Sequence, residues 1–259
     1  MDLDYEGFKK NIWQMTGIDL SKYKEAQMKR RLIALREKRS FRTFSDYYQS
    51  LSADKNMREE FLDRMTINVS EFYRNPSRWE VLEQKILPRL LEERSSLKVW
   101  SAACSTGEEP YTLSMILSET SGISNFSILA TDLDEHVLEH AKNGYYLEKA
   151  VQDVPLLKKK RYFSKQELGY RVCDDLKKHV AFKKQNLLSD SCGNDFDLIV
   201  CRNVMIYFTE EAKTALYEKF SKALRPGGTL FVGSTEQIFN PGLYALETEE
   251  PFFYRKKEK

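Results

Sequence analysis

Apolar residues three or four positions apart dominate the first 70 residues of the chain. Each such run predicts an amphipathic helix, because residues at this spacing share one helix face. The predicted helices are centred on residues 8–15, 28–35, 44–51 and 61–69. The alternation that is typical of strands does not occur here, so we expect residues 1–70 to form a small all-helical domain.

A fifth helical pattern places Trp79, Leu82, Ile86 and Leu90 on one side of the chain. It predicts a linker helix over residues 71–95. Proline has no N–H group and its ring displaces the preceding turn, so we expect Pro88 to kink this helix.

From residue 96 onward, short apolar runs alternate with amphipathic stretches. Strands that alternate with helices predict a mostly parallel, doubly wound α/β sheet. The strands are predicted at 98–102, 127–131, 179–183, 196–201 and 229–232, with an edge strand at 252–254, and the helices at 110–119, 135–143 and 210–224. Residues 145–178 interrupt the alternation, and their apolar pieces at 162–163 and 170–172 predict a small inserted β-subdomain.

The composition is that of a folded globular protein, with 41% hydrophobic and 31% charged residues, which excludes wholesale disorder. No run reaches the roughly 18 apolar residues that a membrane-spanning helix needs. The first six residues are acidic and have no apolar core, unlike a secretory signal. The four cysteines form no C-x-x-C pair, so we expect reduced thiols, no metal site and a cytoplasmic location.

The net charge of +2 is unevenly distributed. Residues 22–42 contain nine basic residues and only two acidic ones. Such a one-signed segment favours an acidic partner, although a solvated helix face is the plainer interpretation.

Ligands of doubly wound sheets bind at the carboxyl ends of the strands, so the loops that follow each strand are the candidate site. The first loop, residues 102–110, has one glycine and the carboxylates Glu108 and Glu109. Two negative charges would repel a pyrophosphate, whereas they suit a cationic ligand such as a sulfonium compound that carries an ammonium group. A plain connecting loop with a helix-capping glutamate is the alternative.

The next loops offer further polar groups. Asp132 ends the second strand, where a carboxylate can accept the hydroxyls of a ribose; alternatively, Asp132 or Asp134 caps the following helix. Asn186 follows the third strand and can contact an adenine edge, or it is only a turn residue. Arg202 and Asn203 end an apolar strand, where a structural role is hard to assign.

Five stretches resemble one known family, and they occur in the family's order. They are residues 68–74, 100–111, 130–132, 186–187 and 201–208. Over nearly the whole chain the sequence is similar to the CheR family, the chemotaxis receptor protein-glutamate O-methyltransferases. The resemblance implies a Rossmann-like class I methyltransferase sheet with an N-terminal all-α domain and a small inserted β-subdomain.

The resemblance also implies S-adenosyl-L-methionine as methyl donor and S-adenosyl-L-homocysteine as product. Arg74 and Tyr207 match family positions that act near the methyl transfer, and the choice between Glu108 and Glu109 stays open. By position, the implied cofactor contacts are Asn68, Ser70, Arg74, Glu109, Asp132, Asn186, Leu187, Arg202 and Asn203.

The implied partners are the cytoplasmic domains of methyl-accepting chemotaxis receptors, with the protein acting as a monomer and without membrane insertion. A glutamate side chain is already ionised at neutral pH, so its methylation needs no general base. In some family members the β-subdomain tethers a receptor's C-terminal peptide.

Two other functions compete with this interpretation. An RNA methyltransferase could hold phosphates with the basic helix, but that helix lacks interleaved aromatic residues, and we expect no nucleic-acid partner. A non-catalytic protein that senses the cofactor is the second alternative, and the intact set of loops argues against it.

Overall fold

The structure, a computed structural model, describes residues 3–66 and 69–258. It divides into two compact units. The described residues of 1–68 form the first unit together with Tyr207–Ala215. Residues 69–206 and 216–259 belong to the second, again as far as they are described.

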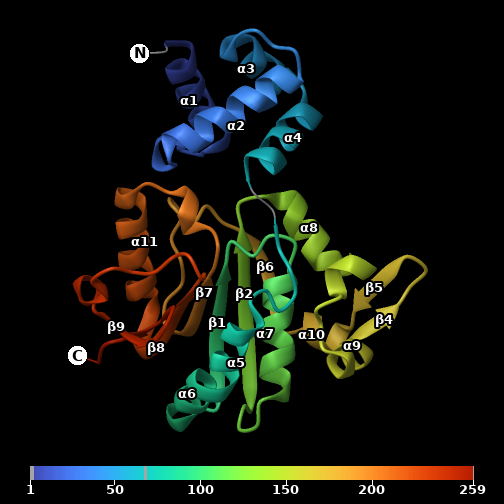
Figure 1. The fold of residues 1–259 in the computed structure, drawn as a ribbon, viewed down its shortest axis with the longest axis vertical. Helices are drawn as coiled ribbons and strands as arrows, with labels where there is room; N and C mark the ends of the chain where they lie inside the picture. The colour runs from blue at the N-terminus through green and yellow to red at the C-terminus, as the bar shows by residue number, and fades with distance from the viewer. Residues whose placement is uncertain (1–2, 67–68, 259) are drawn as a thin grey trace. The chain divides into compact units, whose positions relative to one another are not determined.

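The described N-terminal part of the first unit contains four helices, α1 (Leu3–Thr16), α2 (Glu25–Lys38), α3 (Phe44–Ala53) and α4 (Lys55–Met65), with a short 3-10 turn at Leu20–Lys22 (Figure 1). Its core is aromatic, since the ring of Phe8 lies 4.8 Å from that of Phe44 and 6.0 Å from those of Tyr47 and Phe61. The all-helical prediction for this segment therefore agrees with the observed helices.

The predicted fourth helix was too long. Helix α4 ends at Met65, where the Thr66 N–H closes the last turn on the Leu62 carbonyl. Val69 was predicted to lie on the apolar face of this helix, but it is non-helical and 57% exposed. An apolar residue after the last turn has no helix face to share.

Helices α5 (Pro76–Val81) and α6 (Leu87–Glu93) are joined by a π-helical turn, Leu82–Ile86. The Leu87 N–H donates to the carbonyl of Leu82, five residues earlier. This wider π-helical turn lies just before Pro88. Proline has no backbone N–H group, so it cannot donate the regular α-helical hydrogen bond to the carbonyl four residues earlier. The irregularity expected at Pro88 is present, but the linker helix begins at Pro76 rather than at residue 71.

The second unit contains a seven-stranded sheet in the order β6-β2-β1-β7-β8-β10-β9. The first five of these strands are parallel, and β10 and β9 are antiparallel additions. Their bounds are β6 Val180–Lys184, β2 Asn125–Asp132, β1 Ser96–Ala102, β7 Phe196–Cys201, β8 Leu224–Val232, β10 Phe253–Lys256 and β9 Leu246–Glu250. Strand order reverses between β1 and β7, which is where such sheets bind ligands.

Helices cover both faces of this sheet. Val99 of β1 packs in the large core cluster with residues of α5, α6 and α7 (Glu108–Glu119), which lie in front of the sheet in Figure 1. Trp100 points to the opposite face, where its ring lies 5.5 Å from Phe220 of α11 (Glu210–Ala223). Alternation along β1 thus builds one core on each side of the sheet.

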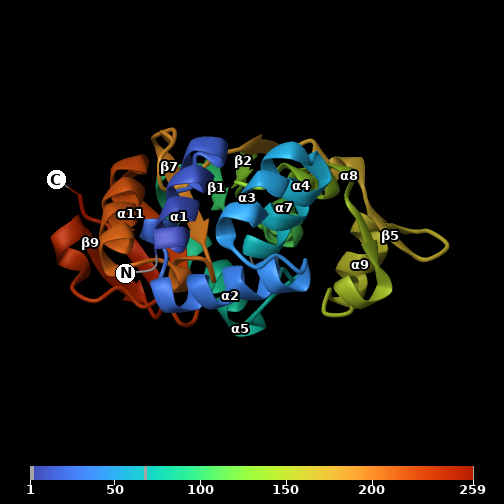
Figure 2. The ribbon, with the colours of Figure 1, turned by 90° about the horizontal axis from the view of Figure 1, so that it is seen from above.

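Residues between α8 (Glu135–Asn143) and β6 form a separate three-stranded sheet, β3-β5-β4. Its strands are β3 Tyr145–Leu147, β4 Phe163–Lys165 and β5 Gly169–Val172, with helices α9 Leu156–Tyr162 and α10 Asp174–Lys177. In Figure 2 the loop that joins β4 and β5 projects beyond α9 at the right of the view. An inserted β-subdomain was predicted here, although β3 was not foreseen.

Two predictions at the end of the sheet were wrong. The strand predicted at 229–232 begins earlier, at Leu224, because residues 224–228 form its irregular first part. The strand at Phe253–Lys256 is not an edge strand, because it pairs with β8 on one side and with β9 on the other. The unforeseen β9 carries three glutamates among its five residues, a composition typical of protected sheet edges.

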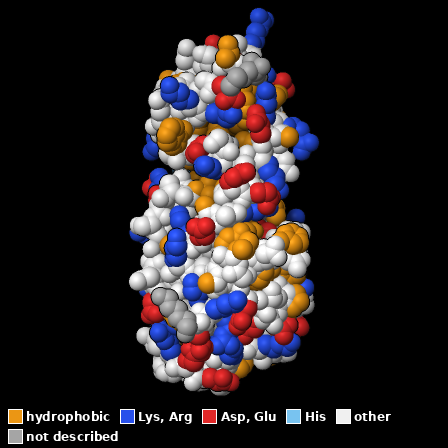
Figure 3. Space-filling view, turned by 90° about the vertical axis from the view of Figure 1, so that its left-hand side faces the viewer, with side chains coloured by type: hydrophobic (Ala, Val, Ile, Leu, Met, Phe, Trp, Pro, Cys, Tyr) orange, Lys and Arg blue, Asp and Glu red, His pale blue; other side chains and the backbone are white. Residues whose placement is uncertain are grey.

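The surface is charged with both signs. On the face drawn in Figure 3, basic and acidic side chains are intermixed around small hydrophobic areas. Within the described ranges, no helix is long and apolar enough to cross a membrane.

Candidate active site

The loop between β1 and α7 is tightly folded at the switch point of the sheet. Ala103, Ser105 and Gly107 all have positive φ angles, of 59°, 49° and 97°. A Cβ atom on Gly107 would lie 2.8 Å from the Cβ of Ala141 and 2.9 Å from the hydroxyl of Tyr146. The single glycine is therefore required both by backbone conformation and by space.

The two glutamates of this loop have different surroundings. Glu108 is buried, and its Oε2 accepts a hydrogen bond from the Thr106 hydroxyl at 2.7 Å. Glu109 accepts from the Ser101 hydroxyl at 2.8 Å and lies 4.0 Å from a guanidinium nitrogen of Arg202. Burial raises the pKa of Glu109 to about 7, although Arg202 opposes this shift.

Asp132 ends β2 and binds two backbone N–H groups. Its Oδ2 accepts from Ser105 at 2.8 Å and its Oδ1 from Asp134 at 3.0 Å. Burial raises the pKa of this carboxyl above its usual range, and the two backbone donors partly offset that effect. Asp134, not Asp132, caps α8 by accepting from the His136 N–H. Asp132 thus joins the ends of two loops beside the switch point.

Arg202 follows β7 and is 7% exposed. Its Nη2 donates to the Arg74 carbonyl at 2.8 Å and to the Asn75 side chain at 3.0 Å. Its guanidinium also lies over the rings of Trp79 and Phe231, at 5.0 and 4.9 Å. One cation therefore ties the segment before α5 to the end of β7.

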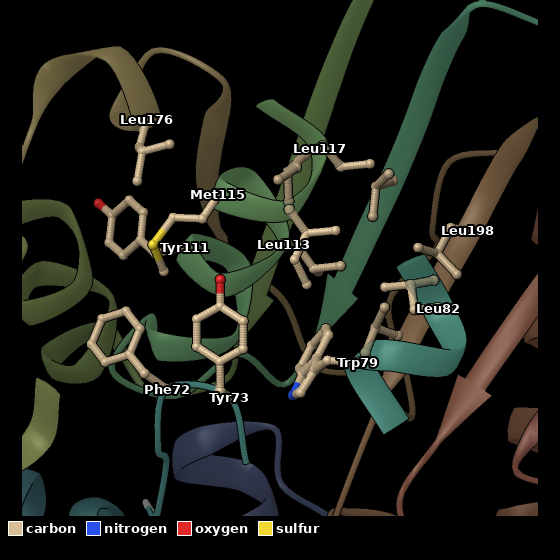
Figure 4. Close-up of a cluster of buried hydrophobic side chains, with 14 of the residues drawn as sticks. Phe72, Tyr73, Trp79, Leu82, Tyr111, Leu113, Met115, Leu117, Leu176 and Leu198 are labelled. Carbon is tan, nitrogen blue, oxygen red and sulfur yellow. The ribbon is translucent and has the colours of Figure 1, made fainter. Parts of the chain in front are cut away.

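The segment Val69–Asn75 is anchored by its aromatic side chains. Figure 4 shows the rings of Phe72 and Tyr73 pointing into the core, with Tyr111 and Met115 nearby. The indole N–H of Trp79 donates to the Arg74 carbonyl at 3.0 Å. The side chain of Arg74 is only half-buried, and its guanidinium donates to the Val69 carbonyl at 3.2 Å. The backbone of Arg74 is fixed while its side chain stays partly accessible.

Asn203 adopts a left-handed conformation, with φ of 61°. In the described part of the chain, its buried Oδ1 and the buried Oγ of Ser105 have no hydrogen-bond partner. Glu236, which the sequence analysis missed, accepts the N–H of Asn203 at 2.7 Å. Only its place shortly after a buried strand could have marked Glu236 in the sequence.

Asn186 and Leu187 follow β6 in a compact turn. The side-chain oxygen of Asn186 accepts from the Leu188 N–H at 3.0 Å, which is a turn contact. Leu187 is buried, and its carbonyl accepts from Lys219 at 2.7 Å. The turn role considered for Asn186 is therefore present, and its predicted contact with adenine stays a prediction.

Three predicted site residues remain. Asn68 is outside the described residues, and Ser70 lies half-buried in the segment before α5. Tyr207 belongs to the first unit, where its carbonyl accepts from the Lys24 N–H at 2.9 Å and Arg31 lies 5.9 Å over its ring. Among the described residues, no three histidine, cysteine or acidic side chains converge as a metal site.

Comparison with known protein families shows which family this chain belongs to. Residues 68–250 match the family model described as "CheR methyltransferase, SAM binding domain". Residues 3–66 match the one described as "CheR methyltransferase, all-alpha domain". The chain belongs to the CheR methyltransferase family. The CheR resemblance and the Rossmann-like methyltransferase fold with an all-α N-terminal domain are confirmed.

Curated CheR relatives match along nearly the whole chain. A chemotaxis protein methyltransferase from Listeria monocytogenes is 43% identical over 99% of this chain and 98% of its own. One from Borreliella burgdorferi is 36% identical over 95% and 92%, and chemotaxis protein methyltransferase 1 from Pseudomonas aeruginosa is 33% identical over 98% of each.

The CheR domain binds S-adenosylmethionine, and the residues of this chain fit that cofactor. Two carboxylates, Glu109 at the start of α7 and Asp132 at the end of β2, have oxygens that can accept hydrogen bonds from cationic or hydroxyl groups of such a ligand. The buried polar atoms of Ser105 and Asn203 have no partner within the described residues, as expected of groups that face a ligand. The chain is a methyltransferase that uses S-adenosylmethionine.

Proposed function

We propose that this CheR methyltransferase transfers a methyl group to glutamate side chains in the cytoplasmic regions of chemoreceptors. Its relationship to chemotaxis protein methyltransferases over 99% of its length carries the proposal. A glutamate carboxylate is ionised at neutral pH and attacks a sulfonium methyl without losing a proton. The reaction therefore needs positioning and exclusion of water more than a general base.

The proposed cofactor contacts are Asn68, Ser70, Arg74, Glu109, Asp132, Asn186, Leu187, Arg202 and Asn203. Bound S-adenosylmethionine supplies the electrophilic methyl group. Each glutamate accepts one side-chain hydrogen bond, Glu108 from Thr106 and Glu109 from Ser101. Glu109 is the choice for the cofactor's ammonium group because it also lies beside Arg202, another proposed cofactor contact. Asp132 keeps lone pairs for the ribose, because each of its oxygens has two and accepts a backbone hydrogen bond with one, Oδ2 from Ser105 and Oδ1 from Asp134.

Arg74 and Tyr207 are the proposed catalytic residues. The partly accessible guanidinium of Arg74 can hold the incoming carboxylate by a bidentate pair. Tyr207 would contribute a hydroxyl donor near the methyl transfer. A second full ion pair would stabilise the ground-state carboxylate and slow its attack, so a neutral donor suits the reaction better.

The proposed domains are a receptor-recognition domain at residues 1–70, a linker at 71–95 and a methyltransferase domain at 96–259 with its β-subdomain near 145–178. The basic segment 22–42 would attract the acidic surface of a receptor. The protein is proposed to act as a cytoplasmic monomer.

The test is methyl transfer from a radiolabelled donor in the presence of a purified receptor cytoplasmic fragment or total RNA. We expect label on the receptor fragment that is released by mild base, as for a methyl ester. Label on RNA would support the nucleic-acid alternative. Binding of the cofactor without label on either substrate would support a sensing protein and contradict the proposal.

A further inference from the structure

Glu236 binds an unusual number of backbone N–H groups from one loop. It lies after β8, and its side chain is buried, with the residue 5% exposed. Its Oε2 accepts from Asn203 at 2.7 Å and from Gly233 at 2.8 Å. Its Oε1 accepts from three consecutive N–H groups, those of Val204 at 2.8 Å, Met205 at 2.7 Å and Ile206 at 3.3 Å.

Four of the five donors are consecutive residues of the loop after β7. Such convergence requires the left-handed conformation of Asn203, with φ of 61°, followed by the 3-10 turn Met205–Tyr207. Successive N–H groups in this arrangement form an anion-binding concavity. Here the anion is a side chain of the same chain, and its bonds are of the strong, charge-assisted kind.

The neighbouring Gly233 is explained by the same contact. A Cβ atom at this position would lie 2.5 Å from Oε2 of Glu236 and 2.7 Å from the Asn203 nitrogen. No positive φ is recorded for Gly233, so space rather than backbone conformation requires glycine here. The Glu236 carboxylate and the small Gly233 together fix where the loop 203–206 lies.

We propose that Glu236 is a positioning residue that holds the loop 202–206 in its cofactor-binding conformation. The loop carries Arg202, whose guanidinium reaches Glu109 and Arg74, and Asn203, whose buried Oδ1 has no partner among the described residues. Fixing the Asn203 N–H fixes the direction of that side chain. The inference rests on the proposed cofactor contacts of Arg202 and Asn203.

The test compares Glu236→Gln with Glu249→Gln. The Gln side chain keeps the shape of Glu236 but turns an amide N–H2 toward two or more of the five donors. Glu249 is the control, because it is partly buried and also accepts hydrogen bonds, from Arg89 and Thr229, but outside this loop. For each variant the dissociation constant of S-adenosylhomocysteine, kcat and the free energy of unfolding are measured.

We expect Glu236→Gln to raise the dissociation constant about 10-fold or more and to lower kcat at a temperature where the protein is fully folded. Glu249→Gln is expected to lower stability with a dissociation constant within about 2-fold of the parent. A folded Glu236→Gln protein that only loses stability, as the control does, would overturn the inference.

Gly233→Ala disturbs the same loop from the other side of the contact. Glu236→Gln and Gly233→Ala both disrupt the packing of Glu236 against the loop. The variant that carries both should therefore bind S-adenosylhomocysteine little worse than the weaker-binding single variant. Fully additive effects would contradict a shared contact. If Glu236→Gln does not fold, Gly233→Ala alone decides, and unchanged affinity of the folded protein would overturn the inference.

Asn203→Ala separates this inference from the proposed cofactor contacts. If Asn203→Ala weakens binding while Glu236→Gln does not, the positioning role is wrong and the contact stands. If Asn203→Ala leaves the affinity unchanged, the proposed contact of Asn203 is wrong, and the inference that rests on it falls too.

Discussion

Two adjacent glutamates at the start of α7 have different surroundings in this protein. Glu108 and Glu109 have the same side chain, but Glu108 is bound to Thr106 and Glu109 lies between Ser101 and Arg202. The sequence left the choice between them open, because periodicity does not say which carboxylate turns toward the strand ends. The surroundings of Glu109 give it the perturbed pKa that is common at functional sites.

Glu109 should make stability depend on pH. Its pKa is raised from 4.5 to about 7 in the folded protein, so the folded state binds the proton more tightly than the unfolded state does. Its contribution to stability is present below pH 4.5 and is lost as pH rises toward 7. The unfolding free energy of the parent minus that of Glu109→Gln should therefore fall by about 3 kcal/mol across this range.

Urea unfolding of both proteins at a series of pH values measures this difference. A difference that stays constant between pH 4.5 and 7 would show that Glu109 titrates normally.

Gly107→Ala should destabilise the protein. The new Cβ would approach Ala141 to 2.8 Å, and alanine disfavours a φ of 97°. We expect the unfolding free energy to drop by about 1–3 kcal/mol, measured by urea denaturation. Gly242→Ala is the control, since its Cβ would meet only the end of Lys257, at 3.9 Å. Equal effects of the two substitutions would refute the steric explanation.

Arg74→Ala should reduce turnover severely while leaving the fold intact. Alanine keeps the carbonyl of this residue, which accepts from Trp79 and Arg202, and loses the bond from its partly accessible guanidinium to the Val69 carbonyl. We expect kcat to fall about 100-fold or more in methyl-transfer assays, because the carboxylate loses its orienting group. Arg78→Ala, which removes a guanidinium that lies over Phe252, is the control. Turnover near the parent value would refute the role of Arg74.

At the scale of elements, the bounds of a helix or strand were predicted best where the sequence marks both its first and its last residue. Helix α8 has its expected bounds, because Asp134 caps its start and Gly144 ends it with a φ of 64°. Strand β7 also has its expected bounds. Its six residues are all buried and read as one short, mostly apolar run, which is typical of a central strand. Strand β9 was missed because its sequence, Leu-Glu-Thr-Glu-Glu, resembles a solvated surface segment.

Long-range contacts explain what the sequence could not predict in the site. The strand-end loops and the residues Arg202 and Asn203 were recognised from their positions after strands. The role of Glu236 was not recognised, because its partners lie about thirty residues earlier in the chain and are backbone groups of any residue type. Backbone hydrogen bonds leave no pattern in side chains.

Helix α2 carries the basic segment, but its charges are not equivalent. Arg31 donates to the Met65 carbonyl at 2.8 Å, and Arg36 lies 4.8 Å over the ring of Phe44, so both support the helical unit itself. Arg30 and Arg42 are exposed. A charge-reversal test should therefore use the exposed pair and spare Arg31.

The variant with Arg30→Glu and Arg42→Glu should have a higher KM for the receptor fragment. We expect an increase of about 5-fold or more at low ionic strength that shrinks with added salt, because exposed charges are screened. The dissociation constant of S-adenosylhomocysteine should stay unchanged. Steady-state kinetics at two salt concentrations measure both effects, and an unchanged KM would mean that the basic segment 22–42 is only solvated.

At the scale of the whole molecule, both parts of the chain match the CheR family, residues 3–66 and residues 68–250. The second unit contains most of the proposed cofactor contacts, whereas Tyr207 and the basic helix belong to the first. The two proposed catalytic residues, Arg74 and Tyr207, thus belong to different units.

The most direct test of the central claim is to map the methylated residue by tandem mass spectrometry. The protein is incubated with S-adenosylmethionine and a receptor cytoplasmic fragment, and the fragment is digested under mildly acidic conditions that preserve esters. The account predicts the added methyl group on glutamate side chains of the receptor. Methyl groups on lysine, arginine or asparagine nitrogen, with none on glutamate, would contradict it.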